Sequence, residues 1–264
     1  MAELLVDIGL NLGNARFRRD RDAVVARALA AGVTRMVLTG TSVPASEQAL
    51  ALALAHPGVL WSTAGVHPHD ASRCGPRTLD ALRRLAASPT VVAIGECGLD
   101  FNRDFSPRPV QERWFSAQIE LACERQMPLF LHERDAAERM LVILSRFGAD
   151  LPPAVIHCFT GSAETLGAYL ELGLHVGITG WICDERRGEP LQRAVSAIPL
   201  DRLLVETDAP YLTPRDLTPK PKGGRNEPAF LPHITRAVAH HMGHSFEAVA
   251  RASTANAVAF FGLG

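Results

Sequence analysis

Eight short runs of β-branched and aliphatic residues recur along the chain, separated by helix-like stretches. They are centred near Val6, Val37, Ser62, Ala93, Phe130, Ile156, Gly177 and Leu204, at intervals of roughly 21 to 37 residues. Strands that alternate with helices at this spacing are typical of βαβ units, in which consecutive strands run parallel. Several runs, such as VVAIG and AVIHCF, are continuously apolar, as expected of parallel strands covered on both faces. The pattern predicts an α/β fold.

A (β/α)8 barrel of the TIM type accounts for the whole pattern as a single domain, residues 1–264. Such barrels commonly have about 250 residues. The alternative is an open doubly wound sheet, which the same alternation permits. Against it, no GxGxxG follows the first run, and the candidate catalytic residues end several runs rather than one switch point. We therefore expect a barrel.

Four helices and one long loop can also be assigned from pattern. Residues 20–31 have helical character up to Gly32, and apolar residues recur at helical spacing after the Ser106–Pro107 pair. Residues 209–228 are rich in Pro, Lys and Arg and are expected to form a long loop. Two further helices are expected near residues 228–241 and 245–260.

Composition excludes several classes of protein. The chain is 47% hydrophobic and 21% charged with a formal net charge of −1, so a protein that coats long duplexes by its overall charge is not expected. The five cysteines form no CxxC pair, which favours reduced packing residues and a cytoplasmic protein. We see no signal peptide and no apolar run of about 20 residues that would cross a membrane. Nothing in the sequence calls for more than a monomer.

Four of the apolar runs end in side chains that bind metal ions or handle protons. Glu96 lies in GECGLD, His132 ends PLFLH, His157 ends AVIH and Asp208 ends RLLVETD. In a barrel the carboxyl ends of all strands meet at one rim, so these side chains are expected to converge there. Carboxylates with neutral imidazoles suit a catalytic divalent cation that keeps positions open for water and substrate. We therefore predict that Glu96, His132 and His157 bind the metal and that Asp208 faces the same pocket.

The two carboxylates of this set, Glu96 and Asp208, are also predicted to be catalytic. Glu96 can bridge two cations, and residues 91–102 contain no Lys or Arg that would make it a simple salt-bridge partner. Asp208 is predicted to orient or deprotonate the attacking water, with Glu206 as an anchor two residues deeper on the same face. The simpler interpretations are a surface turn for Glu96 and a loop-capping acid for Asp208.

Three further residues are predicted to contact substrate. His67 and His69 flank Pro68 at the end of the third run, where each could position a phosphate or a water, and His69 could instead cap the following helix. Arg134 follows His132 by two residues and could clamp a phosphate, or pair with a neighbouring acid on a solvated loop. The alternatives for these residues stay open.

Basic and aromatic residues near the predicted rim suggest contacts with a nucleic-acid backbone and bases. The basic residues are Arg215, Lys220, Lys222 and Arg225, and the aromatic residues are Trp181 and Tyr211. A charge cluster is usually solvated surface, and large aromatics usually complete core packing. Beside a metal site, the same residues could lead a strand in and stack on its bases.

The chain resembles the TatD family of metal-dependent deoxyribonucleases nearly end to end. The strings that carry the resemblance are DIGLNL, TAGVHPHD, VVAIGECGLDFNRDF, HCFTG, GITGWICDERRG, ETDAPYLTPRDLTPKP and RNEP. The resemblance implies a barrel of the amidohydrolase type. It also implies a cytoplasmic nuclease that trims single-stranded DNA or RNA from the 3′ end, with DNA repair as an expected role.

Carried over residue by residue, the family's metal ligands fall on Glu96, His132, His157 and Asp208. The cofactor expected is one or two divalent ions, Mg²⁺ first, with Mn²⁺ or Zn²⁺ as alternatives. The departure lies in the first strand, where most relatives have a DxHxH segment and this chain has Asp7, Gly9 and Asn11. Glycine offers no ligand atom and asparagine only a weak amide oxygen, so the first metal position is expected to be weaker.

The leading hypothesis is therefore a divalent-metal-dependent 3′-5′ exonuclease that hydrolyses phosphodiester bonds of single strands. A second hypothesis keeps the barrel and the metal but assigns a small ester, amide or phosphate substrate, because fold alone does not decide substrate. A third is a binding protein that has lost activity together with its first-strand histidines.

Overall fold

The computed structural model describes residues 4–264 and contains one parallel sheet whose strands follow chain order. The strands are β1 (Leu5–Leu10), β2 (Val33–Leu38), β3 (Leu60–Ala64), β4 (Val91–Asp100), β5 (Leu129–Arg134), β6 (Ala154–Ile156), β7 (His175–Ile178) and β8 (Leu203–Val205). Each contains one of the eight predicted runs. A bridge between Leu10 and Ala209 also links β1 to the segment after β8. The predicted (β/α)8 barrel fold is confirmed.

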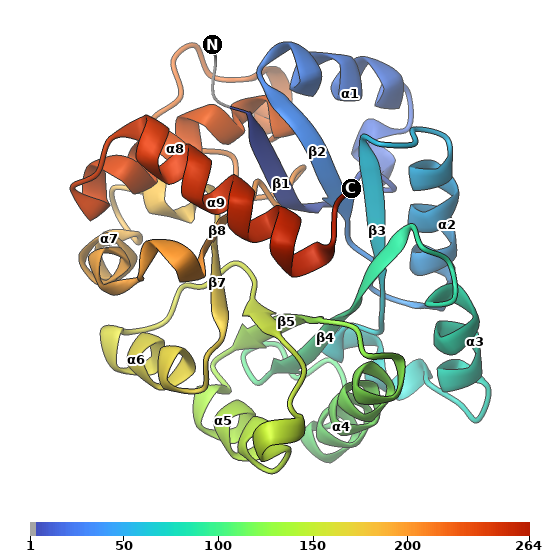
Figure 1. Cartoon of the computed structure of the whole chain (residues 1–264). Coiled ribbons are helices and arrows are strands. Elements are labelled where there is room, and N and C mark those ends of the chain that lie inside the picture. Colours follow the sequence, from blue (N-terminus) through green and yellow to red (C-terminus); the bar gives the residue numbers. More distant parts are fainter. Residues whose placement is uncertain (1–3) are drawn as a thin grey trace. The chain divides into compact units, whose positions relative to one another are not determined.

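Helices alternate with the strands along the chain (Figure 1). They are α1 (Arg21–Ala30), α2 (Val43–Leu54), α3 (Thr78–Leu85), α4 (Arg108–Arg125), α5 (Ala137–Ser145), α6 (Ala163–Glu171), α7 (Glu189–Ala194), α8 (Leu231–Met242) and α9 (Phe246–Phe261). The four predicted helices match α1, α4, α8 and α9 within a few residues. Residues 209–228 form a loop, interrupted only by short 3₁₀ turns. Within residues 4–264, no helix has the length and apolar character to span a bilayer.

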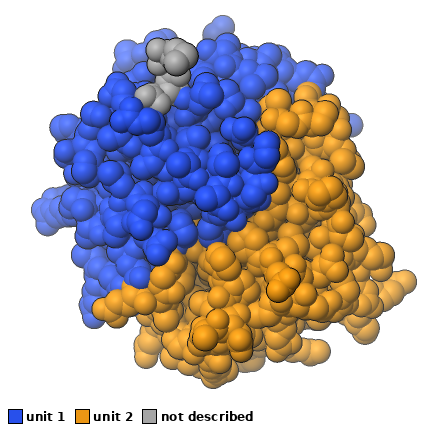
Figure 2. All heavy atoms as spheres, viewed as in Figure 1, with its two compact units in different colours: residues 1–38, 158–170, 175–264 blue, residues 39–157, 171–174 orange. Residues whose placement is uncertain are grey.

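The chain divides into two compact units, coloured blue and orange in Figure 2. Unit 1 comprises Met1–Leu38, Cys158–Leu170 and His175–Gly264, and it contains the paired strands β1–β2 and β7–β8. Unit 2 comprises Thr39–His157 and Glu171–Leu174, and it contains β3 to β6. The assignment of residues 1–264 to a single domain stays a prediction.

Strand β4 is the centre of unit 2 and is buried at every position. Its pairing with β5 shifts register between Gly95 and Cys97, and such a bulge re-aims the side chain that lies in it, here Glu96. Gly95 and Gly98 have φ values of +144° and +142°. A Cβ atom on Gly98 would lie 1.9 Å from the carbonyl oxygen of His132. Glycine is therefore required here, since β4 and β5 approach too closely for any side chain.

Candidate metal centre

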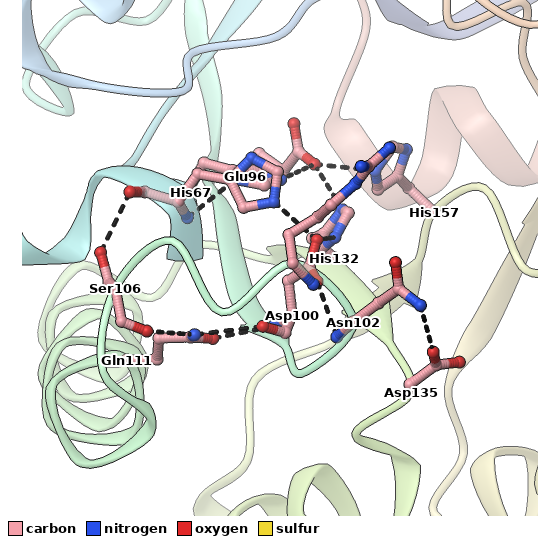
Figure 3. A network of polar contacts seen from close by, with 11 residues as sticks. His67, Glu96, Asp100, Asn102, Ser106, Gln111, His132, Asp135 and His157 are labelled. Atoms are coloured by element: carbon pink, nitrogen blue, oxygen red, sulfur yellow. Dashed lines mark hydrogen bonds and ion pairs between the residues drawn. The ribbon is translucent and has the colours of Figure 1, made fainter.

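Three imidazoles surround one carboxylate oxygen in unit 2 (Figure 3). Glu96 Oε1 lies 2.9 Å from His132 Nδ1, 2.9 Å from His157 Nε2 and 3.3 Å from His67 Nε2. These side chains come from β4, from β5, and from the residues that follow β6 and β3. The structure thus brings together three of the four predicted metal ligands, together with one residue predicted to contact substrate.

The cluster is electrostatically coupled. Burial alone would raise the pKa of Glu96, but the surrounding histidines, His157 first, hold it well below its usual range. Burial alone would lower the pKa of His132, but the nearby carboxylates of Asp100 and Glu96 outweigh it and raise the pKa. A buried carboxylate that stays ionised among imidazoles is an arrangement suited to a cation.

Asp100 is a member of this site for which no role was predicted from the sequence. Its Oδ2 lies 2.6 Å from His69 Nε2 and 3.5 Å from His132 Nε2, while its Oδ1 accepts hydrogen bonds from the backbone N–H groups of Asn102 and Arg103. Asp100 therefore lies behind His132, on the side of the ring opposite Glu96. A carboxylate in that position orients an imidazole and increases its basicity as a ligand.

The hydrogen bonds of His67 define its tautomer. Its Nδ1 accepts from the backbone N–H of His69 at 3.1 Å, so the proton of the neutral ring is on Nε2, which faces Glu96. Burial lowers the pKa of His67 and keeps the ring neutral. His67 therefore presents a donor to the site rather than a ligand lone pair.

The alternatives left open for the two histidines are also resolved in part. His67, not His69, caps the 3₁₀ helix Pro68–Arg73, and His69 bonds instead to Asp100. The alternative in which His69 caps the helix was therefore wrong, because Pro68 turns the chain before His69 can reach a free N–H group. The substrate contacts predicted for His67, His69 and Arg134 stay predictions.

Two buried glutamines of α4 fix the backbone beneath these groups. Gln111 bonds to both the N–H and the carbonyl of Asp100, at 2.8 and 3.1 Å. Gln118 does the same for Val66, the residue before His67, at 2.7 and 3.1 Å. The side-chain amides thus satisfy strand ends that would otherwise be unpaired in the interior.

The residues present fit a divalent cation. The side-chain atoms of His67, Glu96 and His132 that face the site lie within 4.8 Å of one another, and the carboxylate of Glu96 with the imidazole of His132 is a common donor set for such ions. His132 Nε2 is buried without a hydrogen bond of good geometry, which leaves this ring positioned mainly by its ion pairs. Imidazole donors favour Zn²⁺ over Mg²⁺, whereas carboxylate and phosphate oxygens suit Mg²⁺ and Mn²⁺.

Asp208, the fourth predicted ligand, belongs to unit 1. Its Oδ1 accepts a hydrogen bond from Asn11 Nδ2 at 2.8 Å, and its backbone N–H donates to Gly9 O at 2.8 Å. Asn11 thus presents its amide N–H₂, not its oxygen, to the carboxylate. Its role here is a hydrogen-bond donor, and the weaker first metal position stays a prediction.

The other two acids of unit 1 have structural partners. Asp7 accepts from the N–H and the hydroxyl of Thr207 at 2.9 and 2.5 Å, which ties β1 to the end of β8, and burial raises its pKa to about 7. Glu206 Oε1 accepts from the N–H of Cys158 at 2.5 Å. The predicted anchoring role of Glu206 stays a prediction.

Four of the six predicted basic and aromatic residues have identifiable surroundings in unit 1. Trp181, Tyr211 and Arg215 line one pocket of unit 1, of about 320 Å³, together with Arg16 and Arg187. Arg225, for which solvated surface and a nucleic-acid contact were both left open, forms ion pairs with Asp20 and Glu227 and packs over Phe17. Its partner Asp20 lies 205 residues away in sequence, so this pairing could not be anticipated.

The comparisons with known proteins cover almost the whole chain. A family model described as TatD related DNase matches residues 6–262. The 3′-5′ ssDNA/RNA exonuclease TatD of Salmonella typhimurium is 55% identical over 257 residues, which cover 97% of this chain and 98% of that protein.

Two solved structures are also similar. The structure of YJJV, a TatD homolog from Escherichia coli K12, has a TM-score of 0.89 at 26% identity and covers 98% of each chain. The hydrolase TatD family protein from Entamoeba histolytica has the same TM-score at 24% identity and covers 100% of each chain, which shows the fold alone.

Proposed function

The chain belongs to the TatD-related DNase family, and from this membership we propose that it is a divalent-metal-dependent 3′-5′ exonuclease acting on single-stranded DNA and RNA. The observation that carries the proposal is the ring of three imidazoles around Glu96, in a chain 55% identical to a protein named for that activity. The cytoplasmic location, the monomeric state and a role in DNA repair stay predictions.

Glu96, His132 and His157 would hold the cation, with Asp208 as the fourth predicted ligand. A bound divalent cation supplies a Lewis acid that polarises a phosphoryl oxygen and makes water a better nucleophile at neutral pH. Asp100 fixes the ring of His132 through its Oδ2, 3.5 Å from Nε2. The metal could be Mg²⁺, Mn²⁺ or Zn²⁺, as one ion or two.

Two further roles belong to the chain's own proton-handling groups. His67 carries its proton on Nε2, so it would donate a hydrogen bond to a phosphate oxygen. Asp208, held by the amide of Asn11, would orient the attacking water and accept its proton. His69 and Arg134 would contact the phosphates of the substrate.

The proposal is tested with one oligonucleotide labelled at either end and digested over time across a series of Mg²⁺, Mn²⁺ and Zn²⁺ concentrations. The wild type should shorten single strands from the 3′ end, and Glu96→Gln should lose at least about 100-fold in rate, because it removes the central charge. Glu124→Gln is the matched control, since Glu124 is an exposed acid paired with Arg83.

The same assay separates the alternatives. Cleavage of small esters, amides or phosphate esters with oligonucleotides left intact would replace this proposal with a small-substrate hydrolase. Stoichiometric binding of single strands without turnover at saturating metal would indicate a binding protein. Full activity of Glu96→Gln would refute the assigned site.

A further inference from the structure

A thiol, a carboxylate and an imidazole come together in unit 1, at residues that the proposed reaction does not use. Cys183 ends the 3₁₀ helix Gly180–Cys183, Asp216 lies in the 209–228 loop and His233 lies in the first turn of α8. Their ligand atoms lie within 4.8 Å of one another. We propose that Cys183, Asp216 and His233 form a second metal site, selective for Zn²⁺ and similar borderline-soft cations.

The ligand atoms, all within 4.8 Å of one another, need only small shifts to reach tetrahedral spacing. Ligand atoms at 2.0 to 2.3 Å from a tetrahedral zinc stand about 3.3 to 3.8 Å apart. In the structure His233 Nε2 lies 2.7 Å from Asp216 Oδ1, which is a hydrogen bond, so an ion would take the place of the shared proton. Asp216 has the freedom to adjust, because about half of its side chain is exposed.

The donor set decides which ion binds. Mg²⁺ prefers oxygen ligands, whereas a thiolate with an imidazole selects zinc or a similar transition metal. The thiolate and the carboxylate together carry two negative charges, which a divalent ion neutralises. The site is therefore chemically distinct from the Glu96 centre, which contains carboxylate and imidazole groups but no thiol ligand.

The chain around the site supports a linking role. Next to Cys183, Asp184 lies 3.7 Å from the guanidinium of Arg215, the neighbour of Asp216. Two consecutive residue pairs thus face each other between the 3₁₀ helix and the loop. The third ligand, His233, connects both to α8, so one ion would join three segments far apart in sequence.

The segments that this ion would join also form part of the wall of the 320 Å³ pocket of unit 1. Trp181, Asp184, Tyr211 and Arg215 line it, and they lie on the two segments that Cys183 and Asp216 would join. We infer that bound Zn²⁺ holds this pocket wall in place. The inference concerns a separate set of residues and stands even if the proposed nuclease activity fails.

Cobalt titration of the full-length protein tests the site directly. Co²⁺ bound to a thiolate gives a near-ultraviolet charge-transfer band that a carboxylate–imidazole site does not give. The band should saturate at one equivalent in Glu96→Gln, in which the Glu96 centre no longer competes for the ion. It should reach the same final intensity in the wild type, where Co²⁺ also fills the Glu96 centre, and should be lost in Cys183→Ser. Zn²⁺ added afterwards should abolish it by displacing Co²⁺.

Controls distinguish ligation from folding defects. Cys74→Ser and Cys158→Ser remove other thiols and should retain the band. If Cys183→Ser does not fold, Asp216→Asn and His233→Gln, which alter more exposed side chains, should weaken Co²⁺ binding at least about 10-fold. No band in the wild type, or an undiminished band in Cys183→Ser, would overturn the proposal.

Discussion

Replacing Asp100 by asparagine should weaken metal binding without disturbing the backbone. The new side chain would keep an oxygen for the N–H groups of Asn102 and Arg103, and would put a neutral amide where Oδ2 now faces His69 and His132. Loss of a carboxylate behind a ligating imidazole typically costs about 10- to 100-fold in metal affinity, or about 1.4 to 2.7 kcal/mol.

The effect should depend on pH, because the same carboxylate increases the affinity of His132 for protons. Asp100 and Glu96 raise the pKa of His132 against the opposing effect of burial, so at acid pH a proton competes for the ring in the wild type. In Asp100→Asn this pKa falls and the competition weakens. The difference in apparent metal affinity between the two proteins should therefore be largest at alkaline pH and narrow as the pH falls.

The assay measures, at several pH values, the metal concentration that gives half-maximal cleavage of a single-stranded oligonucleotide. Calorimetry at the same pH values measures metal binding directly. Asp104→Asn serves as the control, since Asp104 is an exposed acid that follows β4 and pairs with Arg108 at the start of α4. Saturating metal should restore most of the rate of Asp100→Asn. If the variant and the wild type need the same metal concentration for half-maximal cleavage at alkaline pH, the reasoning is refuted.

Three other perturbations have expected outcomes. Gly98→Ala should lower the free energy of unfolding by about 3 kcal/mol or more in urea titrations and weaken metal binding, because its Cβ would clash with the carbonyl of His132. Tyr211→Ala should raise KM for single strands about 10-fold through lost stacking, while a kcat loss with unchanged KM would argue against stacking. Burial raises the pKa of Asp7 to about 7 from 3.8, so its contribution to stability is complete below about pH 4 and is lost as the pH rises to 7. Over that pH range the free energy of unfolding should fall less for Asp7→Asn than for the wild type, with a difference in slope of up to about 1.4 kcal/mol per pH unit. Parallel curves of unfolding free energy against pH for the two proteins would contradict the pKa shift.

Strand positions and the convergence of three predicted metal ligands could be predicted from the sequence because they depend on local pattern. Glu96, His132 and His157 each follow an apolar run, and parallel order brings the ends of neighbouring strands together. The position of Asp100 behind His132 could not be predicted from the sequence. It depends on how far β4 continues past Glu96 and on two backbone N–H groups in the turn that follows.

Other features depend on pairings between distant segments, which composition does not encode. The basic cluster suggested that Arg225 attracts a nucleic acid, yet this guanidinium is neutralised by Asp20. The tautomer of His67 follows from one N–H of the residue two positions later. Similarly, Cys183 resembles a packing cysteine in the sequence, and only the fold brings Asp216 and His233 to it.

The substitution in the first strand explains why the Glu96 cluster carries the greater share of metal binding in this proposal. Where the family's DxHxH segment supplies imidazole ligands, Asn11 donates an amide N–H to Asp208 and Gly9 offers only a backbone oxygen, which accepts from the N–H of Asp208. Both groups fix the orientation of Asp208 but add no lone pair of an imidazole. An ion that depends on this strand must then gain ligands from substrate oxygens, so its binding should tighten when a single strand is present, whereas binding at Glu96 should change little.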